Sequence, residues 1–293
     1  MSPVAAATSP TVARFAPSPT GYLHLGHVRS VLEGWRAARS DRGRFLLRLE
    51  DIDSTRCRDH YAAAILEDLS WLGLDWDGPV RKQSEHFDDY QQALRRLDAL
   101  GVLYPCFCTR REIQAEIARA GGAPHGDAGL RYPGTCRRMG SDEAVARRHS
   151  GMDYALRLDV VRALALTGPL DWVERGCRRQ ADPAMHGDVV LARKEIPASY
   201  HLAVTVDDAI QGITLVTRGE DLVAATHIHR VLQALLDLPT PHYRHHQLLT
   251  DAAGRRLAKR DGAMTIRAMR QQGMTPSEVI AMAETALAPS PPP

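Results

Sequence analysis

The segment from Arg14 to His27, with the sequence RFAPSPTGYLHLGH, constrains the fold of this chain more than any other segment. Its prolines and Gly21 are suited to a tight turn between a strand and a helix. Gly26 would let a flat ring approach the backbone, and a helix N-terminus favours phosphate, to which His24 and His27 could donate. The segment therefore predicts a nucleotide site. The alternative is a chance occurrence of His-x-Gly-His in a chain with 13 histidines.

The hydrophobic pattern around this segment predicts an α/β fold. Apolar residues that return at three- and four-residue steps predict helices at 27–39, 61–72, 86–100 and 222–238. Short apolar runs predict strands at 45–49, 188–191, 203–206 and 213–216. Strands that alternate with helices in this way are typical of α/β proteins.

We expect a catalytic core that is divided by an insertion. Residues 11–101 would form its first half and residues 188–270 its second half. Residues 102–187 contain cysteines, a Gly-Gly-Ala-Pro segment and arginine pairs in place of clean periodicity, so we interpret them as an insertion. Residues 1–10 are expected to be a disordered tail, and residues 271–293 a short helix with a disordered proline-rich end.

Composition narrows the class of protein but does not name a partner. The chain has no run of about 20 apolar residues and no basic residue ahead of an apolar stretch at its start, so we expect a cytoplasmic protein without membrane contact. A formal charge of +2 permits RNA binding without requiring it. The five cysteines are an odd number, which in a cytosolic protein favours free thiols or metal ligands over disulfides.

The Arg14–His27 segment resembles the HIGH motif of class I aminoacyl-tRNA synthetases, and its first eight residues resemble the glutamyl and glutaminyl branch of that family. The resemblance implies a Rossmann-like parallel sheet, catalytic roles for His24 and His27, and ATP binding at these histidines and Gly26. It also implies that glutamate is held by the start of the segment, at Arg14, Phe15, Ala16, Pro17 and Ser18. An arginine suits this role because its planar guanidinium can bind a carboxylate with two parallel hydrogen bonds.

Three further stretches resemble blocks of the same family. Arg48–Asp53 is similar to its R-x-E-D-x-D stretch, which implies that Glu50 contacts the amino group of the amino acid. Tyr200–Asp208 and Val216–Leu222 are similar to two blocks around the amino-acid pocket, which implies that Tyr200 and Arg218 contact the substrate. The alternatives are a carboxylate that caps a turn and a surface arginine that pairs with a nearby acid.

Residues 255–262, RRLAKRDG, fall where the KMSKS loop of the family belongs. Lys259 is the expected catalytic cation, because positive charge on the ATP phosphates stabilises the departure of pyrophosphate. Arg256, Ala258 and Arg260 depart from the family pattern, which could slow the chemistry or alter the motion of the loop. A basic surface loop is the ordinary alternative. Mg²⁺ is expected with ATP and bound mainly by phosphate oxygens and water, so no protein ligand is assigned to it.

Three cysteines of the insertion, Cys106, Cys108 and Cys136, predict a structural Zn²⁺ site. The alternative is a chance cluster of buried, reduced cysteines. Coordination chemistry alone would choose His125 as the fourth ligand. The pattern C-x-C followed by Y-x-x-x-C is similar to the zinc site of short paralogues of glutamyl-tRNA synthetase, and this resemblance implies Tyr132 instead.

The resemblance covers residues 13–270, and we expect no room for a helical anticodon-binding domain after Met274. The short paralogues imply a monomeric ligase that activates L-glutamate with ATP in the absence of tRNA and transfers it to queuosine in the anticodon of tRNA(Asp). The pair Arg137 and Arg138 would be a candidate RNA contact. The alternatives are a truncated glutamyl-tRNA synthetase that charges the tRNA acceptor end and a catalytically inactive RNA-binding paralogue.

Overall fold

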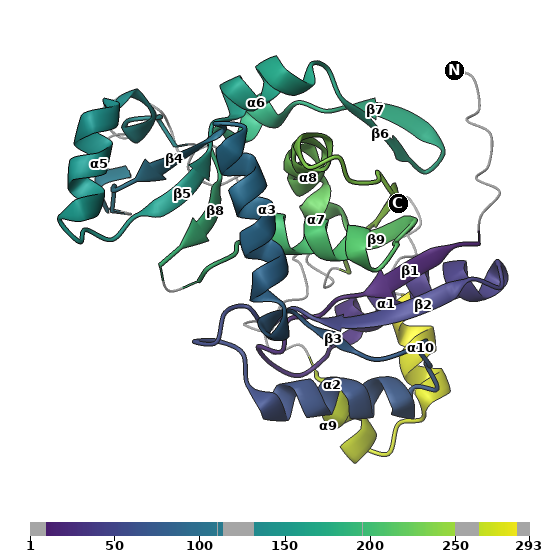
Figure 1. Ribbon diagram of the computed structural model, residues 1–293. Helices are drawn as coiled ribbons and strands as arrows, with labels where there is room; N and C mark the ends of the chain where they lie inside the picture. Colours follow the sequence, from purple (N-terminus) through teal and green to yellow (C-terminus); the bar gives the residue numbers. More distant parts are fainter. Residues whose placement is uncertain (1–9, 110, 114–131, 195, 250–263, 286–293) are drawn as a thin grey trace, which may run out of the picture.

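The computed structural model of the protein describes residues 10–109, 111–113, 132–194, 196–249 and 264–285. Its main sheet has seven strands in the order β3-β2-β1-β9-β10-β6-β7 (Figure 1). The first six of these are parallel, and β7 is antiparallel to β6. The strands are β1 Val12–Phe15, β2 Arg44–Leu49, β3 Arg81–Lys82, β6 Asp171–Glu174, β7 Cys177–Gln180, β9 Leu215–Gly219 and β10 His242–His246. The expected parallel α/β sheet is therefore confirmed.

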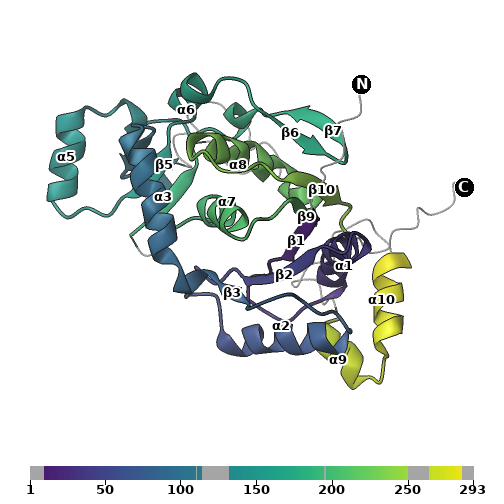
Figure 2. The same ribbon diagram turned by 45° about the vertical axis from the view of Figure 1, so that its right-hand side comes forward.

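Helices cover both faces of this sheet (Figure 2). One face packs against α1 (Leu25–Ser40), α2 (Asp59–Trp71), α9 (Ile266–Gln271) and α10 (Pro276–Thr285). The other face packs against α7 (Tyr200–Ile210) and α8 (Val223–Leu235), which share a core with α3 (Phe87–Ala99) and α6 (Val160–Thr167). None of the described helices has the length and apolar content that a membrane span needs.

Strand alternation assigns each side chain of β1 and β2 to one of these faces. Phe45, Leu47 and Leu49 belong to the core cluster of α1 and α2. Leu46 belongs to a different cluster, and Arg48 lies on that second side, where α7 packs. Because β1 pairs with β2 so that Arg14 lies opposite Leu46, Arg14 and Arg48 project from the same face. The alternation of side chains along β1 and β2 thus directs Arg14 and Arg48 toward α7.

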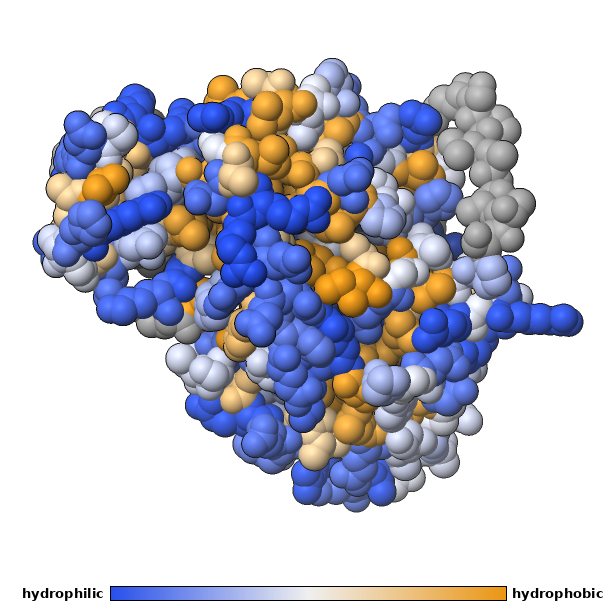
Figure 3. Space-filling view, in the orientation of Figure 1, coloured by the Kyte–Doolittle hydropathy of each residue, from blue (hydrophilic) through white to orange (hydrophobic). Residues whose placement is uncertain are grey.

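The amphipathic pattern of α3 explains its place at the outside of the second helical layer. Its buried residues are Tyr90, Ala93 and Leu97, which follow the three- and four-residue steps of one helical face. The opposite face carries charged side chains, and Figure 3 shows a largely hydrophilic surface over this helix. The helix therefore buries one apolar stripe and leaves the rest of its surface to solvent.

A second, antiparallel sheet in the order β4-β5-β8 lies beside the main one (Figure 1). Its strands are β4 Leu103–Cys106, β5 Ala155–Leu158 and β8 Val190–Arg193, and α5 Ser141–His149 precedes β5. Short 3-10 turns complete the described chain at η1 Gln83–Glu85, η2 Cys136–Arg138, η3 Pro183–His186 and η4 Glu220–Leu222. β6 and β7 lie within residues 102–187 yet extend the main sheet, whereas β8 follows residue 187 and joins the second sheet. The division expected at residue 187 therefore does not coincide with the division between the sheets.

The expected helices at 27–39, 61–72, 86–100 and 222–238 are confirmed as α1, α2, α3 and α8, with bounds that differ by up to three residues. The expected strand at 203–206 is wrong, because Ala203–Val206 lies inside α7. All four of its residues are buried, since this helix packs against α3, α8 and β8. A short apolar run that is buried on every side has no periodicity with which to distinguish a helix from a strand.

Charged groups at the end of α7 fasten this helix to the sheet. Asp207, which is 0% exposed, accepts hydrogen bonds from Arg81 Nε at 2.8 Å, from Gln83 Nε2 at 2.7 Å and from the Tyr90 hydroxyl at 3.0 Å. Arg48, also 0% exposed, donates to Asp208 Oδ1 at 2.8 Å. Because buried charges of this kind are tolerated only when they are paired, the network fixes α7 in a single position.

We predict that Asp207→Ala destabilises the protein by about 2 to 4 kcal/mol, because it leaves two buried donors, Gln83 and Tyr90, without their acceptor and removes one of the two carboxylates that bind Arg81. Urea unfolding followed by circular dichroism measures this change. Asp171→Ala is the matched control, since Asp171 is 48% exposed and forms a surface ion pair with Arg178, and we expect a change of less than about 0.5 kcal/mol. Equal destabilisation by the two variants would contradict the structural role of Asp207.

Candidate active site

A pocket of about 380 Å³ lies at the carboxyl end of the parallel strands, where β1 meets β9. Strand order continues to β2 on one side of β1 and to β9 on the other, and such a switch point is where open α/β sheets bind ligands. Every described residue that the sequence assigned to ATP or glutamate lines this one pocket, namely Arg14, Phe15, Ala16, Pro17, Ser18, His24, Gly26, His27, Glu50, Tyr200 and Arg218. Lys259 and His125 lie outside the described residues.

The two histidines of the first motif close the N-terminus of α1. His24 is the N-cap, and its Nδ1 accepts from the Gly26 amide at 3.1 Å, while His27 Nδ1 accepts from the His24 amide at 3.1 Å. In a neutral ring an Nδ1 that accepts must leave the proton on Nε2. A Cβ on Gly26 would lie 3.0 Å from the His24 ring, so a larger residue would crowd this cap. The motif therefore fixes both ring orientations and both tautomers.

Arg14 is bound to a carboxylate within the protein. Its Nε and Nη2 donate to Asp208 at 2.9 and 3.3 Å, and its Nη1 donates to the Thr217 carbonyl at 3.2 Å. Burial tends to raise the pKa of Asp208, but the charges of Arg14 and Arg48 keep it below its usual value. The charge of Arg14 is thus largely balanced by an ionised aspartate.

Glu50 follows β2 and faces the same pocket. Its Oε1 accepts from Arg48 Nη2 at 3.2 Å. Burial raises the pKa of this carboxyl group, and the nearby charges of Arg48 and Arg14 offset that effect only in part. A cationic group placed beside Glu50 would favour its ionised form, so this side chain is suited to an ammonium ligand.

Arg218, on β9, is surrounded by neutral acceptors. It donates from Nε to His245 Nε2 at 3.1 Å, from Nη2 to the Thr226 hydroxyl at 2.6 Å and from Nη1 to the Tyr200 hydroxyl at 3.2 Å. His229 Nδ1 lies 3.2 Å from Nη1. Arg218 forms no ion pair within the described part of the chain, in contrast to Arg14. Its positive charge is therefore available to an anionic ligand in the pocket.

A chain of two histidines leads away from Arg218 into the core. His229 Nε2 lies 3.2 Å from His201 Nδ1, which places the two rings in a single hydrogen-bonded row. Burial, together with the nearby charges of His186 and Arg218, lowers the pKa of His201 to about 4. Burial and the charge of Arg218 also bring the pKa of His229 well below its usual value. Both rings are therefore neutral at pH 7 and add no positive charge to the pocket.

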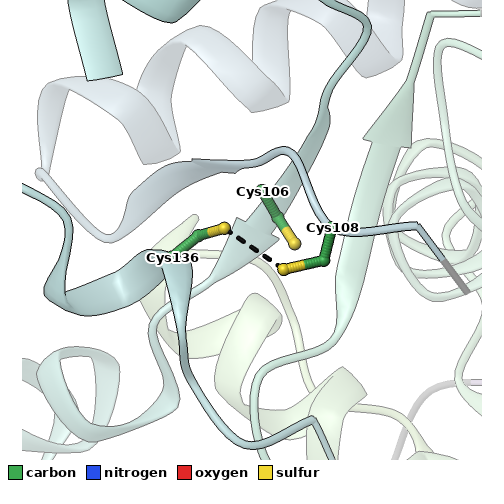
Figure 4. Close-up of side chains that lie close together, drawn as sticks. All are labelled: Cys106, Cys108 and Cys136. Carbon is green, nitrogen blue, oxygen red and sulfur yellow. Dashed lines mark hydrogen bonds between the residues drawn. The ribbon is translucent and has the colours of Figure 1, made fainter. Parts of the chain in front are cut away.

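The three cysteines expected to bind metal come together (Figure 4). The sulfur atoms of Cys106, Cys108 and Cys136 all lie within 4.8 Å of one another, and Cys108 and Cys136 are 3.4 Å apart. The Tyr132 hydroxyl lies 3.5 Å from Cys108 Sγ and accepts from the Cys136 amide at 2.9 Å. Four Zn²⁺ ligands at about 2.3 Å would place sulfur atoms about 3.8 Å apart, so the cluster has the dimensions of a metal site. Cys57 and Cys177 lie outside it.

A second pocket, of about 450 Å³, adjoins the first. The two pockets share Ser18, Thr20, Glu50 and Tyr200 as lining residues. On its far side the second pocket is lined by β8, including Ala192 and Arg193, so it joins the first pocket to the antiparallel sheet. Glu50 lines both pockets, so a molecule in the second pocket would lie on the other side of Glu50 from a molecule in the first pocket.

Several residues that support the site carried no signal in the sequence. Arg14 is bound directly by Asp208, which is 194 residues away along the chain. Arg218 is bound directly by His245, and Glu174 contacts it through His245. Only Asp208 stood inside a motif block. The expected RNA contact at Arg137 and Arg138 divides into two parts, because Arg137 pairs with the buried Asp188 at 3.2 Å while Arg138 is exposed.

Comparison with known proteins shows the family of the chain. A family model described as tRNA synthetases class I (E and Q), catalytic domain, matches residues 10–285. The chain is 48% identical to a protein from Rhodobacter capsulatus named Glutamyl-Q tRNA(Asp) synthetase, over 92% of this chain and 98% of that protein. It is 44% identical to a protein of the same name from Nocardia farcinica, over 96% of this chain and 86% of that protein.

Solved structures show the same fold. The crystal structure of a glutamate tRNA ligase from Elizabethkingia meningosepticum, in complex with its amino acid, superposes with a TM-score of 0.77 at 26% identity. The match covers 94% of this chain and 60% of that ligase, so the chain spans about three fifths of the ligase's length. The expected class I synthetase fold is therefore confirmed.

We predict that the His201 ring stays neutral until the pH falls to about 4. Because a histidine in the unfolded chain titrates near pH 6.5, the unfolded state binds more protons between these values, and the stability that this group contributes falls as the pH falls from about 6.5 to about 4. A proton–carbon NMR titration, assigned with His201→Gln, measures the value. Protonation of His201 near pH 6.5 would contradict its burial beside Arg218.

Proposed function

The chain belongs to the catalytic-domain family of the class I glutamyl and glutaminyl tRNA synthetases, and we propose that it activates glutamate with ATP and transfers it to queuosine in the anticodon of tRNA(Asp). It is an aminoacyl-tRNA synthetase-type ligase. The observation that carries the proposal is the pocket in which Arg218, unpaired with any described carboxylate, faces the same space as Glu50 and the histidine pair. The names of relatives at 44% and 48% identity support the choice of acceptor.

Glutamate has two carboxylates and one ammonium group, and the pocket offers side chains of opposite charge to each kind of group. Arg218 is the cation for a substrate carboxylate, because its charge is not taken up by a direct carboxylate partner among the described residues. Glu50 is the acceptor for the substrate ammonium group, whose charge would stabilise the ionised form of this carboxyl group. The Tyr200 hydroxyl, which accepts from Arg218, closes the pocket between them.

Activation requires alignment and charge, with no general base. The α-carboxylate of glutamate is ionised at neutral pH, so an oxygen of this group attacks the α-phosphorus of ATP directly, and pyrophosphate leaves with the bond electrons. The N-terminus of α1, capped by His24 and His27, offers a position for the ATP phosphates. Mg²⁺ would accompany ATP and neutralise phosphate charge. Lys259, outside the described residues, is the proposed cation for the leaving pyrophosphate.

Transfer requires a hydroxyl group that attacks the activated carbonyl carbon while AMP leaves. The second pocket is suited to the acceptor because it shares Glu50 and Tyr200 with the first pocket. Arg56 and Arg193 line it and supply positive charge near RNA phosphates. We therefore place the queuosine ring in this second pocket.

The cysteine cluster is the proposed site of a structural Zn²⁺. Cys106, Cys108 and Cys136 would provide three thiolates, and Tyr132 is the proposed fourth ligand because its hydroxyl already lies beside Cys108 Sγ. Burial raises the pKa of the Cys108 thiol to about 12, so a cation is needed to hold this sulfur in its thiolate form at neutral pH. A closed set of four ligands leaves no position for a substrate, so the metal would stabilise the fold without taking part in the reaction.

Glutamate-dependent ATP/pyrophosphate exchange in the absence of tRNA tests the proposed function. We expect exchange with the wild-type protein, and transfer of labelled glutamate to tRNA(Asp) that contains queuosine but not to tRNA(Asp) that lacks it. Lys259→Ala should lower the exchange rate by about 10²- to 10³-fold, because charge at the leaving pyrophosphate is lost. Lys82→Ala, at a lysine that pairs with Glu85 on the surface, should leave the rate unchanged.

The RNA group that receives glutamate distinguishes the proposed enzyme from a truncated glutamyl-tRNA synthetase. Exchange followed by charging of tRNA(Glu) at its acceptor end would contradict the proposed transfer to queuosine while leaving glutamate activation intact. Absence of exchange in the folded, metal-loaded protein would overturn the proposal as a whole.

We predict about one Zn²⁺ per chain by elemental analysis of the purified protein. Cys136→Ser should reduce the metal content to near zero and lower the melting temperature, because the remaining ligands would no longer form a closed set. Cys177→Ser is the matched control, since Cys177 is exposed and outside the cluster, and should change neither quantity. Metal-free protein with an unaltered melting temperature would contradict a structural zinc site.

A further inference from the structure

Behind Arg218, on the side away from the pocket, lies a carboxylate and histidine pair that belongs to none of the motif blocks. We propose that Glu174 and His245 are positioning residues, which hold the guanidinium of Arg218 in place for the carboxylate of the substrate while leaving its positive charge unbalanced. This inference rests on the proposed function, because it concerns the same amino-acid pocket.

The contacts form a continuous row from β6 to β9. Both oxygens of Glu174 bind His245, with Oε2 at 2.7 Å from Nδ1 and Oε1 accepting from the backbone amide at 2.9 Å. The opposite nitrogen of the ring, Nε2, accepts from Arg218 Nε at 3.1 Å. All three residues are more than nine-tenths buried, so water does not compete for these hydrogen bonds.

The carboxylate determines which ring nitrogen carries the proton. Burial raises the pKa of Glu174, but the hydrogen bonds from the ring and backbone of His245 outweigh this effect and bring it to about 2. An ionised carboxylate can only accept, so the proton of a neutral His245 must lie on Nδ1. Nε2 then presents a lone pair toward Arg218, as the donating Nε of a guanidinium requires.

Charge balance distinguishes this arrangement from the one around Arg14. Asp208 contacts Arg14 directly, at 2.9 Å, and therefore competes with any substrate carboxylate for that guanidinium. Glu174 contacts Arg218 only through the imidazole ring, which separates the two charges by the width of His245. The side chain of Arg218 is thus held by hydrogen bonds, while its charge is still available to the substrate.

The strands explain how these residues come together. β10 lies between β9 and β6, with His245 paired to Arg218 and Tyr243 paired to Glu174. Segment 171–180, which contributes the β6–β7 hairpin, therefore supplies a residue to the amino-acid site through the neighbouring strand. Tyr243 lies parallel to His245, with ring centroids 6.0 Å apart and an angle of 3° between the rings.

The test measures KM and kcat for glutamate and for ATP in the exchange reaction. Glu174→Ala and His245→Phe should each raise the KM for glutamate by about 10- to 100-fold, because a hydrogen bond to a charged group is lost. The KM for ATP should stay within about twofold, since no ATP group is involved. His245→Gln should recover most of the affinity, because its amide oxygen can accept from Arg218 near the position of Nε2.

Asp171→Asn is the matched control, because it removes a carboxylate from the same strand at an exposed position and should leave both KM values unchanged. If Glu174→Ala fails to fold, Glu174→Gln keeps the shape of the side chain and permits both tautomers of His245, and should raise the KM for glutamate by several-fold. An unchanged KM for glutamate in these variants, or an equal rise in the KM for ATP, would overturn the inference.

A failure of the proposed function can be distinguished from a failure of the positioning role. If the wild-type protein shows no exchange, calorimetric titration with glutamate alone separates the two ideas. Binding to the wild type that is weakened in Glu174→Gln would support the positioning role without activation. Absence of glutamate binding to the folded wild type would overturn both.

Discussion

The structure of the site depends on one fully buried arginine. Arg48 reaches from β2 to Asp208 of α7 and to Glu50 at the end of its own strand, with Asp207 3.7 Å from its Nε. Burial of its charge would be strongly unfavourable without these partners, so the protein can adopt this packing only when α7 supplies both aspartates. The position of α7 in turn places Tyr200, at its first residue, against the pocket. A single electrostatic requirement thus links the sheet, the helix and the site.

The need to pair the buried charge of Arg48 also gives Arg14 and Arg218 different roles in the pocket. Asp208 serves both Arg48 and Arg14, so Arg14 is part of the buried ionic network as well as of the pocket wall. Arg218 lies one strand away, on β9, among hydroxyl groups and imidazoles that accept hydrogen bonds without carrying charge. The low pKa values of His201 and His229 keep these rings neutral and preserve their capacity to accept. Among the described residues, the pocket therefore presents the available positive charge of Arg218 and the carboxyl group of Glu50 to the same space.

The antiparallel sheet connects the cysteine cluster to the second pocket. Cys106 ends β4, which pairs with β5, and β5 pairs with β8. Residues of β8 line the second pocket, so two ladders of backbone hydrogen bonds join the cysteine cluster to its wall. A metal at the cluster would hold this sheet together where its own apolar core is small. The proposed acceptor pocket and the proposed metal site are in this sense one structural unit.

The sequence by itself determined the α/β class and the long amphipathic helices, because each of these follows from a local pattern, and its resemblance to a known family indicated the residues that line the pocket. The sequence placed His24 and His27 at the start of a helix, and the structure added that this pair caps α1 through its ring nitrogens. The cysteines were identifiable because a metal site requires a particular set of side chains. Tertiary structure alone decided that residues 203–206 are helical, since burial on every side erases periodicity. It also decided the partners of the arginines, because a hydrogen bond between Arg218 and His245, or between His245 and Glu174, depends on which strands are neighbours in the sheet, and local sequence does not specify strand order.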